Sequence, residues 1–152
     1  MVGQGYDIMG SAGVFMEDSI FTKIIKGEIP CHKVYEDDLV IAFLDIHPIS
    51  DGHTLVVPKK QIDRLWDVDD ELYAHVMMIA KKIADKIRTV YNPPRVGSMV
   101  EGFEVPHAHY HVFALYKGLK ATMAEYSPES EPDHVKLAEV AKKIALTPQK
   151  NI

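Results

Sequence analysis

The chain has 152 residues, of which 47% are hydrophobic and 26% are charged, and its formal net charge at pH 7 is −5. This length suits one domain. No apolar run approaches the roughly 20 residues that span a bilayer. The negative net charge argues against DNA or RNA as a partner. Cys31 is the single cysteine, which excludes an intrachain disulfide and suits a cytoplasmic protein.

The first segment of the chain, residues 1–16, contains four glycines without apolar periodicity. It lacks the basic start and long apolar centre of a signal peptide, so we expect a flexible N-terminal extension. Asp18 or Ser19 can cap a short helix that ends near Ile25. The apolar side chains of this helix have packing as their simplest role.

Strands follow in the next part of the chain. Residues 33–36 predict one strand, and the continuous apolar run 39–44 is typical of a central strand that is covered on both faces. Asp45 ends this run, where its carboxylate can accept two hydrogen bonds from a ribose diol or serve as a turn residue before Pro48. Residues 53–58 predict another strand.

The longest predicted helix covers residues 69–91, where apolar side chains recur at helical spacing and lysines mark the opposite face. Residues 95–100 predict a further strand. Residues 118–128 read as a loop, and residues 132–145 predict a last helix that carries no chemistry.

The most informative segment is residues 105–116, where His107, His109 and His111 stand at every second position of a run rich in aromatic and branched side chains. In a strand these histidines share one face, over about 13 Å. Three imidazoles are a costly way to build a core, because each ring brings two nitrogens that need partners. The pattern therefore predicts a functional face.

Three interpretations of this face remain open from the spacing. The histidines could have no shared role, or they could bind a metal ion, since alternate histidines on a strand can reach one ion. They could also act on a phosphate ester, where a neutral imidazole attacks phosphorus and its neighbours bind the phosphate oxygens.

The sequence His107-Ala108-His109-Tyr110-His111-Val112-Phe113 resembles the His-x-His-x-His motif of the histidine triad (HIT) superfamily of nucleotide hydrolases and transferases. Residues 18–30, 34–38 and 53–60 resemble segments of its Hint-like branch. The resemblance implies an α+β, HIT-like fold with an antiparallel sheet of about five strands, one long helix and short flanking helices. It implies a HIT domain over residues 17–118 and a homodimer. Residues 119–152 do not match the Hint-like pattern, and we expect them to form a loop and helix packed on the same domain.

The resemblance also implies roles for individual residues. His109 matches the nucleophile that forms a nucleotidyl-histidine intermediate, His107 and His111 match its phosphate-binding neighbours, and His53 matches a histidine that positions the phosphate. Asp45 matches the ribose-binding acid. A purine nucleotide is the implied substrate, and its base matches an apolar pocket formed by Ile20, Phe21, Ile24, Phe43 and Ile46.

Two departures from the family pattern affect the expected chemistry. Ser19, Thr22 and Gln61 stand where many relatives bind zinc, so we predict no structural zinc, and the histidine mechanism needs no metal or cofactor. Glu104 stands where relatives place a hydroxyl near the leaving group, which motivates the hypothesis that phosphoramidates are preferred over dinucleoside polyphosphates. A dinucleoside polyphosphate hydrolase, a nucleotide-binding regulator with little turnover and a metal-dependent hydrolase are the alternatives.

Overall fold

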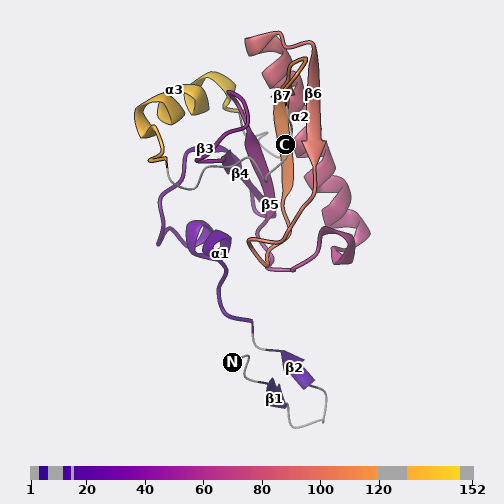
Figure 1. Ribbon diagram of the computed structural model, residues 1–152. Helices are drawn as coiled ribbons and strands as arrows, with labels where there is room; N and C mark the ends of the chain where they lie inside the picture. The colour runs from indigo at the N-terminus through magenta and orange to yellow at the C-terminus, as the bar shows by residue number, and fades with distance from the viewer. Residues whose placement is uncertain (1–3, 7–11, 15, 120–129, 148–152) are drawn as a thin grey trace.

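The computed structural model describes residues 4–6, 12–14, 16–119 and 130–147. Its main feature is a five-stranded antiparallel sheet in the order β3-β4-β5-β7-β6, with helices packed on it (Figure 1). The α+β fold class predicted from the sequence is confirmed. The elements of this body are α1 (Ile20–Ile25), β3 (Lys33–Glu36), β4 (Val40–Leu44), β5 (Thr54–Pro58), a 3₁₀ turn (Leu65–Asp67), α2 (Asp70–Tyr91), β6 (Arg95–Met99), β7 (Tyr110–Leu115) and α3 (His134–Ile144).

The helices begin and end where local chemistry predicts. Ser19 caps α1, because its hydroxyl accepts a hydrogen bond from the backbone N–H of Thr22 at 3.0 Å. Asp69 caps α2 in the same way, accepting from the backbone N–H of Leu72 at 3.0 Å. Asn92 ends α2 in the left-handed conformation, with φ at 45°, which is a common way for a helix to stop.

Both faces of the sheet are covered, as the apolar run of β4 predicts. Val40 and Ala42 belong to a large core cluster with the buried residues of α2 and α3, whereas Ile41 and Phe43 pack with Phe21 of α1. Because successive residues of a strand point to opposite faces, this alternation places α1 on one side of the sheet and the other two helices on the other. The site described below lies on the α1 side.

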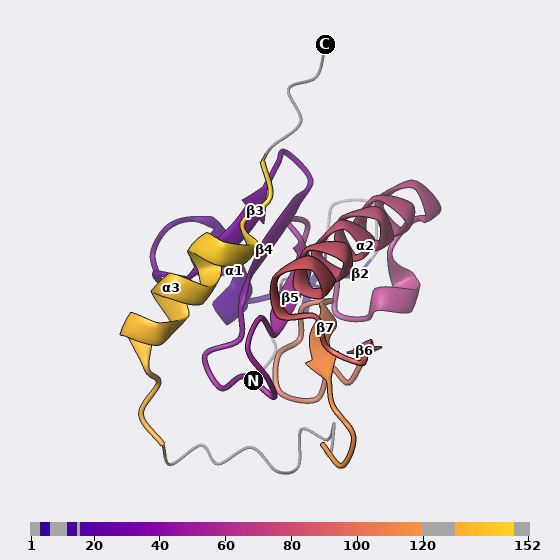
Figure 2. The same ribbon diagram turned by 90° about the horizontal axis from the view of Figure 1, so that it is seen from above.

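The helical face is shared between two helices. α2 contacts β5, β6 and β7, while α3 contacts β3, β4 and α2 (Figure 2). The buried face of α3 consists of Leu137, Val140, Ala141 and Ile144, which belong to the same core cluster as the buried face of α2. No helix in residues 16–119 or 130–147 has the length and apolar character needed to cross a membrane.

The N-terminal residues contain two short strands that the sequence did not predict. β1 (Gln4–Tyr6) and β2 (Ala12–Val14) pair antiparallel in a sheet of their own, which lies apart from the main sheet in Figure 1. Residues 1–3, 7–11 and 15 of the expected flexible extension, and residues 120–128 of the expected loop, lie outside the described residues. Both expectations stay predictions.

Candidate active site

A cavity of about 580 Å³ lies on the α1 side of the sheet. This volume falls within the range of small-ligand sites, roughly 300–1,000 Å³. The cavity brings together every residue that the resemblance implies for nucleotide binding and two of the histidines. These lining residues are Ile20, Phe21, Ile24, Phe43, Asp45, Ile46, Glu104, His109 and His111. His53 and His107 are not among the lining residues, although Nε2 of His53 lies 2.9 Å from Nδ1 of His111.

The triad segment is only partly a strand. β7 begins at Tyr110, so the expected strand is shorter at its N-terminal end. The backbone N–H of Ala108 donates to the carbonyl of Ile62 at 2.6 Å, and that of His107 donates to the carbonyl of Val105 at 2.8 Å. The chain therefore turns before it joins the sheet, and the first triad histidine has surroundings that strand geometry does not predict.

The protonated nitrogen of His109 is fixed by a backbone carbonyl. Its Nδ1 lies 2.6 Å from the carbonyl oxygen of His107, and because that oxygen only accepts, Nδ1 must carry the proton. In the neutral ring, Nε2 then carries the lone pair. The side chain is 8% exposed, and the Phe21 ring packs edge-on against it at 5.0 Å between ring centroids. Burial lowers the pKa of His109, which the hydrogen bond to the His107 carbonyl partly offsets.

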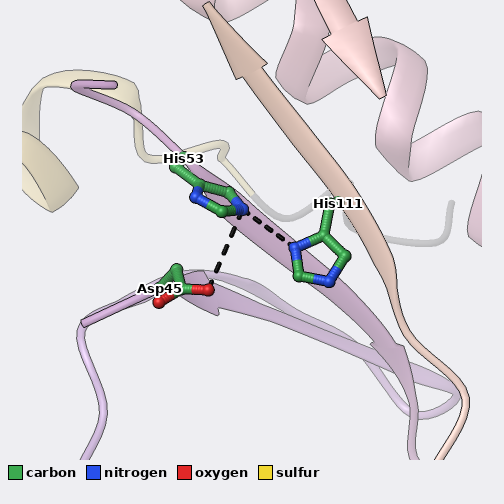
Figure 3. A group of neighbouring side chains, drawn as sticks. All are labelled: Asp45, His53 and His111. Atoms are coloured by element: carbon green, nitrogen blue, oxygen red, sulfur yellow. Dashed lines mark hydrogen bonds and ion pairs between the residues drawn. The ribbon is translucent and has the colours of Figure 1, made fainter. Parts of the chain in front are cut away.

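His53 and His111 form a buried hydrogen-bonded pair (Figure 3). The backbone N–H of Ile49 donates to Nδ1 of His53 at 3.1 Å, so the proton of neutral His53 is on Nε2. That nitrogen lies 2.9 Å from Nδ1 of His111 and donates to it, which puts the proton of His111 on its own Nε2. His111 therefore presents an N–H donor rather than a lone pair from the wall of the cavity.

Burial keeps this pair neutral. Desolvation, followed by the proximity of His111, lowers the pKa of His53 to about 3. Desolvation, followed by the proximity of His109, lowers the pKa of His111 to about 4. Both rings are neutral at pH 7, so the tautomers assigned from the hydrogen bonds are the relevant species.

The side chain of His107 is enclosed by the protein. Its ring is completely buried, Nε2 lies 2.7 Å from the carbonyl oxygen of Pro58, and Nδ1 lies 2.7 Å from the hydroxyl of Ser19. Both ring nitrogens are therefore bonded inside the protein. Burial also lowers the pKa of His107. His107 is thus held inside the protein, whereas His109 and His111 line the cavity, and its expected phosphate-binding role stays a prediction.

A metal ion is the competing occupant of this region. Asp45, His53 and His111 place ligand atoms within 4.8 Å of one another (Figure 3). To bind an ion, however, Nε2 of His53 would have to lose its proton to Nδ1, which would then face the donating N–H of Ile49. The hydrogen bonds thus favour the ion-free pair. The metal-independent site stays a prediction, which this geometry supports.

The charge of the cavity is negative. Its lining includes Asp45, Glu104 and Glu101, and among the lining residues that the structure describes there is neither lysine nor arginine. Glu101 is a site residue that the sequence analysis did not select, although it stands in the same acidic loop as Glu104. This lining disfavours a ligand with several negative charges beyond one phosphate.

Comparisons with known proteins agree on one family. A family model described as the HIT domain matches residues 26–118. An uncharacterised HIT-like protein of Methanocaldococcus jannaschii is 40% identical over 129 residues, which are 82% of this chain and 97% of the relative. An adenosine 5′-monophosphoramidase of Saccharomyces cerevisiae is 36% identical over 126 residues, which are 82% of this chain and 79% of that protein. A crystal structure of a HIT-like protein from Bartonella henselae, described as involved in cell-cycle regulation, is 36% identical, with a TM-score of 0.75 over 86% of this chain and 96% of that one.

Proposed function

This chain belongs to the HIT-domain family of nucleotide-binding proteins and hydrolases, and from that premise we propose that it is a nucleotidyl hydrolase. The proposed substrates are purine nucleoside phosphoramidates, which are cleaved at the α-phosphate through a nucleotidyl-His109 intermediate. The observation that carries the proposal is the hydrogen bond from Nδ1 of His109 to the His107 carbonyl at 2.6 Å. It leaves the Nε2 lone pair of a cavity-lining imidazole as the nucleophile. The 36% identical yeast relative bears the name of such an enzyme.

The reaction has two displacements at phosphorus. In the first, the Nε2 lone pair of His109 forms an N–P bond while the P–N bond to the leaving amine breaks, and the amine departs with a proton taken from the solvent. In the second, water forms a P–O bond at the same phosphorus and gives a proton to the solvent, the N–P bond breaks with its electron pair returning to Nε2, and the nucleoside monophosphate leaves. A neutral imidazole suits this task, because a carboxylate or thiolate would be repelled by the phosphate.

His111 is the residue that we assign to the phosphate oxygens. Its Nε2 carries the proton, since Nδ1 accepts from His53. A fixed N–H donor beside the reacting phosphate stabilises negative charge as it builds in the transition state. His53 acts through His111, so we propose it as a positioning residue. Ile20, Phe21, Ile24, Phe43 and Ile46 would contact the base, and Asp45 the ribose.

The acidic side chains that line the cavity affect which leaving group is preferred. Glu101 and Glu104 both line the cavity, and they favour a neutral or cationic amine over a further phosphate. We expect the double substitution Glu101→Gln and Glu104→Gln to raise kcat/KM for diadenosine polyphosphates about tenfold relative to adenosine 5′-phosphoramidate, because two like charges are removed. The ratio of the two kcat/KM values is the measurement.

The matched control for this charge effect is the double substitution Glu71→Gln and Glu139→Gln. Both residues are exposed on helices, at the start of α2 and on α3, so the net charge changes equally. The control should leave the ratio unchanged. Faster hydrolysis of diadenosine polyphosphates than of the phosphoramidate by the unmodified protein would contradict the assigned preference.

The proposed activity is tested by capturing the intermediate. The protein is mixed with adenosine 5′-phosphoramidate in the presence of EDTA and quenched in base, and the histidine-containing peptide is fragmented in a mass spectrometer. An adenylyl group on His109 is expected. Turnover that EDTA abolishes would favour the metal-dependent alternative, and AMP binding without turnover would favour a nucleotide-binding regulator. The homodimer and cytoplasmic location expected from the sequence remain predictions.

A further inference from the structure

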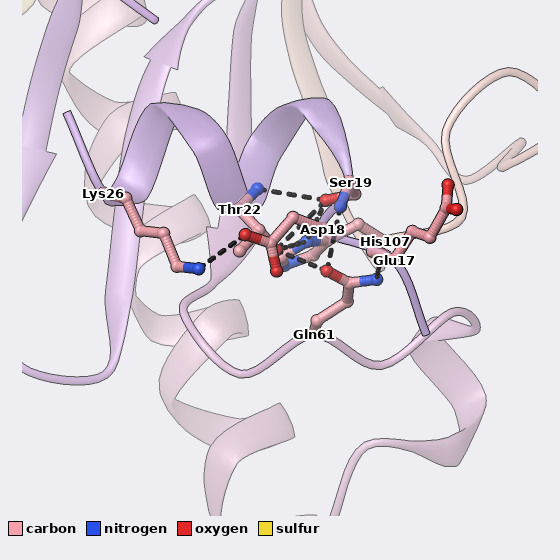
Figure 4. A network of polar contacts seen from close by, with 7 residues as sticks. All are labelled: Glu17, Asp18, Ser19, Thr22, Lys26, Gln61 and His107. Atoms are coloured by element: carbon pink, nitrogen blue, oxygen red, sulfur yellow. Dashed lines mark hydrogen bonds and ion pairs between the residues drawn. The ribbon is translucent and has the colours of Figure 1, made fainter. Parts of the chain in front are cut away.

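A cluster of polar side chains joins the start of α1 to the triad segment (Figure 4). Gln61, from the segment after β5, lies at its centre. Its Oε1 accepts from the backbone N–H of Ser19 at 3.0 Å and from the hydroxyl of Thr22 at 2.5 Å, and its Nε2 donates to the carbonyl of Glu17 at 2.8 Å. One side chain therefore holds the first turn of α1 through three hydrogen bonds.

The hydrogen bond between Ser19 and His107 can be given a direction. The carbonyl of Pro58 can only accept, so Nε2 of His107 carries the proton and Nδ1 of the neutral ring must accept. The hydroxyl of Ser19 donates to that Nδ1 at 2.7 Å. The hydroxyl of Thr22 donates to Gln61, so Ser19 is the hydroxyl whose proton is directed at His107.

His107 is connected directly to the proposed nucleophile. Its backbone carbonyl accepts from Nδ1 of His109 at 2.6 Å, and this bond decides which nitrogen of His109 carries the lone pair. A shift of the His107 backbone would loosen that bond and rotate the His109 ring. Phe21 of α1 packs edge-on against both rings, at centroid distances of 5.9 Å to His107 and 5.0 Å to His109. The helix and the nucleophile are thus held as one unit.

We infer that Ser19, Thr22 and Gln61 are positioning residues, which fix the tautomer and orientation of the His109 nucleophile through the ring and backbone of His107. Thr22 bonds to Gln61, Gln61 bonds to the chain at the start of α1, and Ser19 bonds to His107. None of the three lines the cavity as the structure describes it. They therefore act on the rate of the reaction and not on nucleotide contacts. This inference rests on the proposed role of His109.

The test compares Ser19→Ala, which removes the hydroxyl, with Ser19→Thr, which keeps it. We expect Ser19→Ala to lower kcat for adenosine 5′-phosphoramidate by about 10- to 100-fold, because small misplacements of a catalytic group cost about this much. KM and the Kd for AMP should stay within about threefold. Ser19→Thr should restore kcat to within about threefold of the unmodified protein. Equal losses of kcat in both variants, or a proportional rise of KM in Ser19→Ala, would overturn the inference.

Gln61→Met gives a second variant, because Gln61 is only half-buried and its replacement keeps the Ser19 hydroxyl that caps α1. Gln61→Met should also lower kcat and leave KM unchanged. It therefore tests the inference even if Ser19→Ala folds poorly after losing its helix cap. Unchanged kcat in a folded Gln61→Met protein would overturn the inference.

Ring ¹⁵N chemical shifts separate this inference from the proposed activity. In the unmodified protein, His109 should show the Nδ1–H tautomer and His107 the Nε2–H tautomer. In Ser19→Ala and Gln61→Met, the His109 shifts should move toward a mixture of tautomers, whether or not the protein turns over a phosphoramidate. Unaltered His109 shifts in both variants would exclude the positioning role, while absent turnover in the unmodified protein would exclude only the activity.

Discussion

Replacing His109 with alanine is expected to reduce turnover of adenosine 5′-phosphoramidate by about 10⁴-fold or more, the range in which loss of a catalytic nucleophile falls. The reason is that Nε2 of His109 carries the lone pair on the cavity wall, whereas His111 presents a proton and His107 has both nitrogens bonded. No neighbouring triad histidine therefore offers a lone pair in its place. Single-turnover kinetics with EDTA present would measure the loss.

Two controls make this result specific. His134→Ala removes an exposed histidine at the start of α3 and should leave turnover within about twofold. AMP binding by His109→Ala, followed by calorimetry, should remain within about tenfold, because the apolar walls of the cavity are intact. A His109→Ala protein that keeps more than about a tenth of the original turnover would show that His109 is not the nucleophile.

Acidification is expected to destabilise the protein by about 3 kcal/mol between about pH 7.5 and about pH 5.5, through His53 and His111 alone. In the folded chain their pKa values are about 3 and about 4, lowered first by desolvation. In the unfolded chain both rings titrate near 6.5, so below that pH the unfolded state binds more protons. The stabilisation is therefore complete above about pH 6.5 and is lost as the pH falls toward the folded pKa values. Urea unfolding at several pH values measures it.

The variant that isolates this contribution is His53→Gln with His111→Gln, which replaces both titrating rings by amides. Its free energy of unfolding should be lower at neutral pH and should fall less steeply on acidification than that of the unmodified protein. The slope of the free energy of unfolding against pH can be compared between the two proteins whatever their stability at neutral pH. A pH dependence as steep as the original would mean that the buried pair does not carry the effect.

The predicted helices and strands agree with the structure because each has a local cause. The strand expected over residues 33–36 is β3, and the apolar run 39–44 contains β4 with both faces buried. α2 begins one residue after its predicted start, because Asp69 is the cap and not the first helical residue. Apolar periodicity and caps are properties of short segments, so they could be read without knowing the fold.

The cavity was partly predictable as well. Motif order identified residues in α1, at the end of β4 and in the triad segment that the structure gathers around one cavity, among them Phe21, Asp45 and His109. Glu101 was missed, because its loop has no regular spacing that assigns a side chain to a direction. Period-two alternation is also valid only within a regular strand, and β7 begins at Tyr110.

The sequence by itself therefore determined the α-helices and the strands of the main sheet, the fold class, the family and the histidine segment of this protein. Only the tertiary structure decided which ring nitrogen of each triad histidine carries the proton, because a tautomer depends on which donor or acceptor stands beside each nitrogen. For His107 that partner is Ser19, 88 positions away in the chain, and for His111 it is His53, 58 positions away. Spacing along the chain assigns a side chain to a face of a strand, but hydrogen-bond partners are set by elements that meet only when the chain folds.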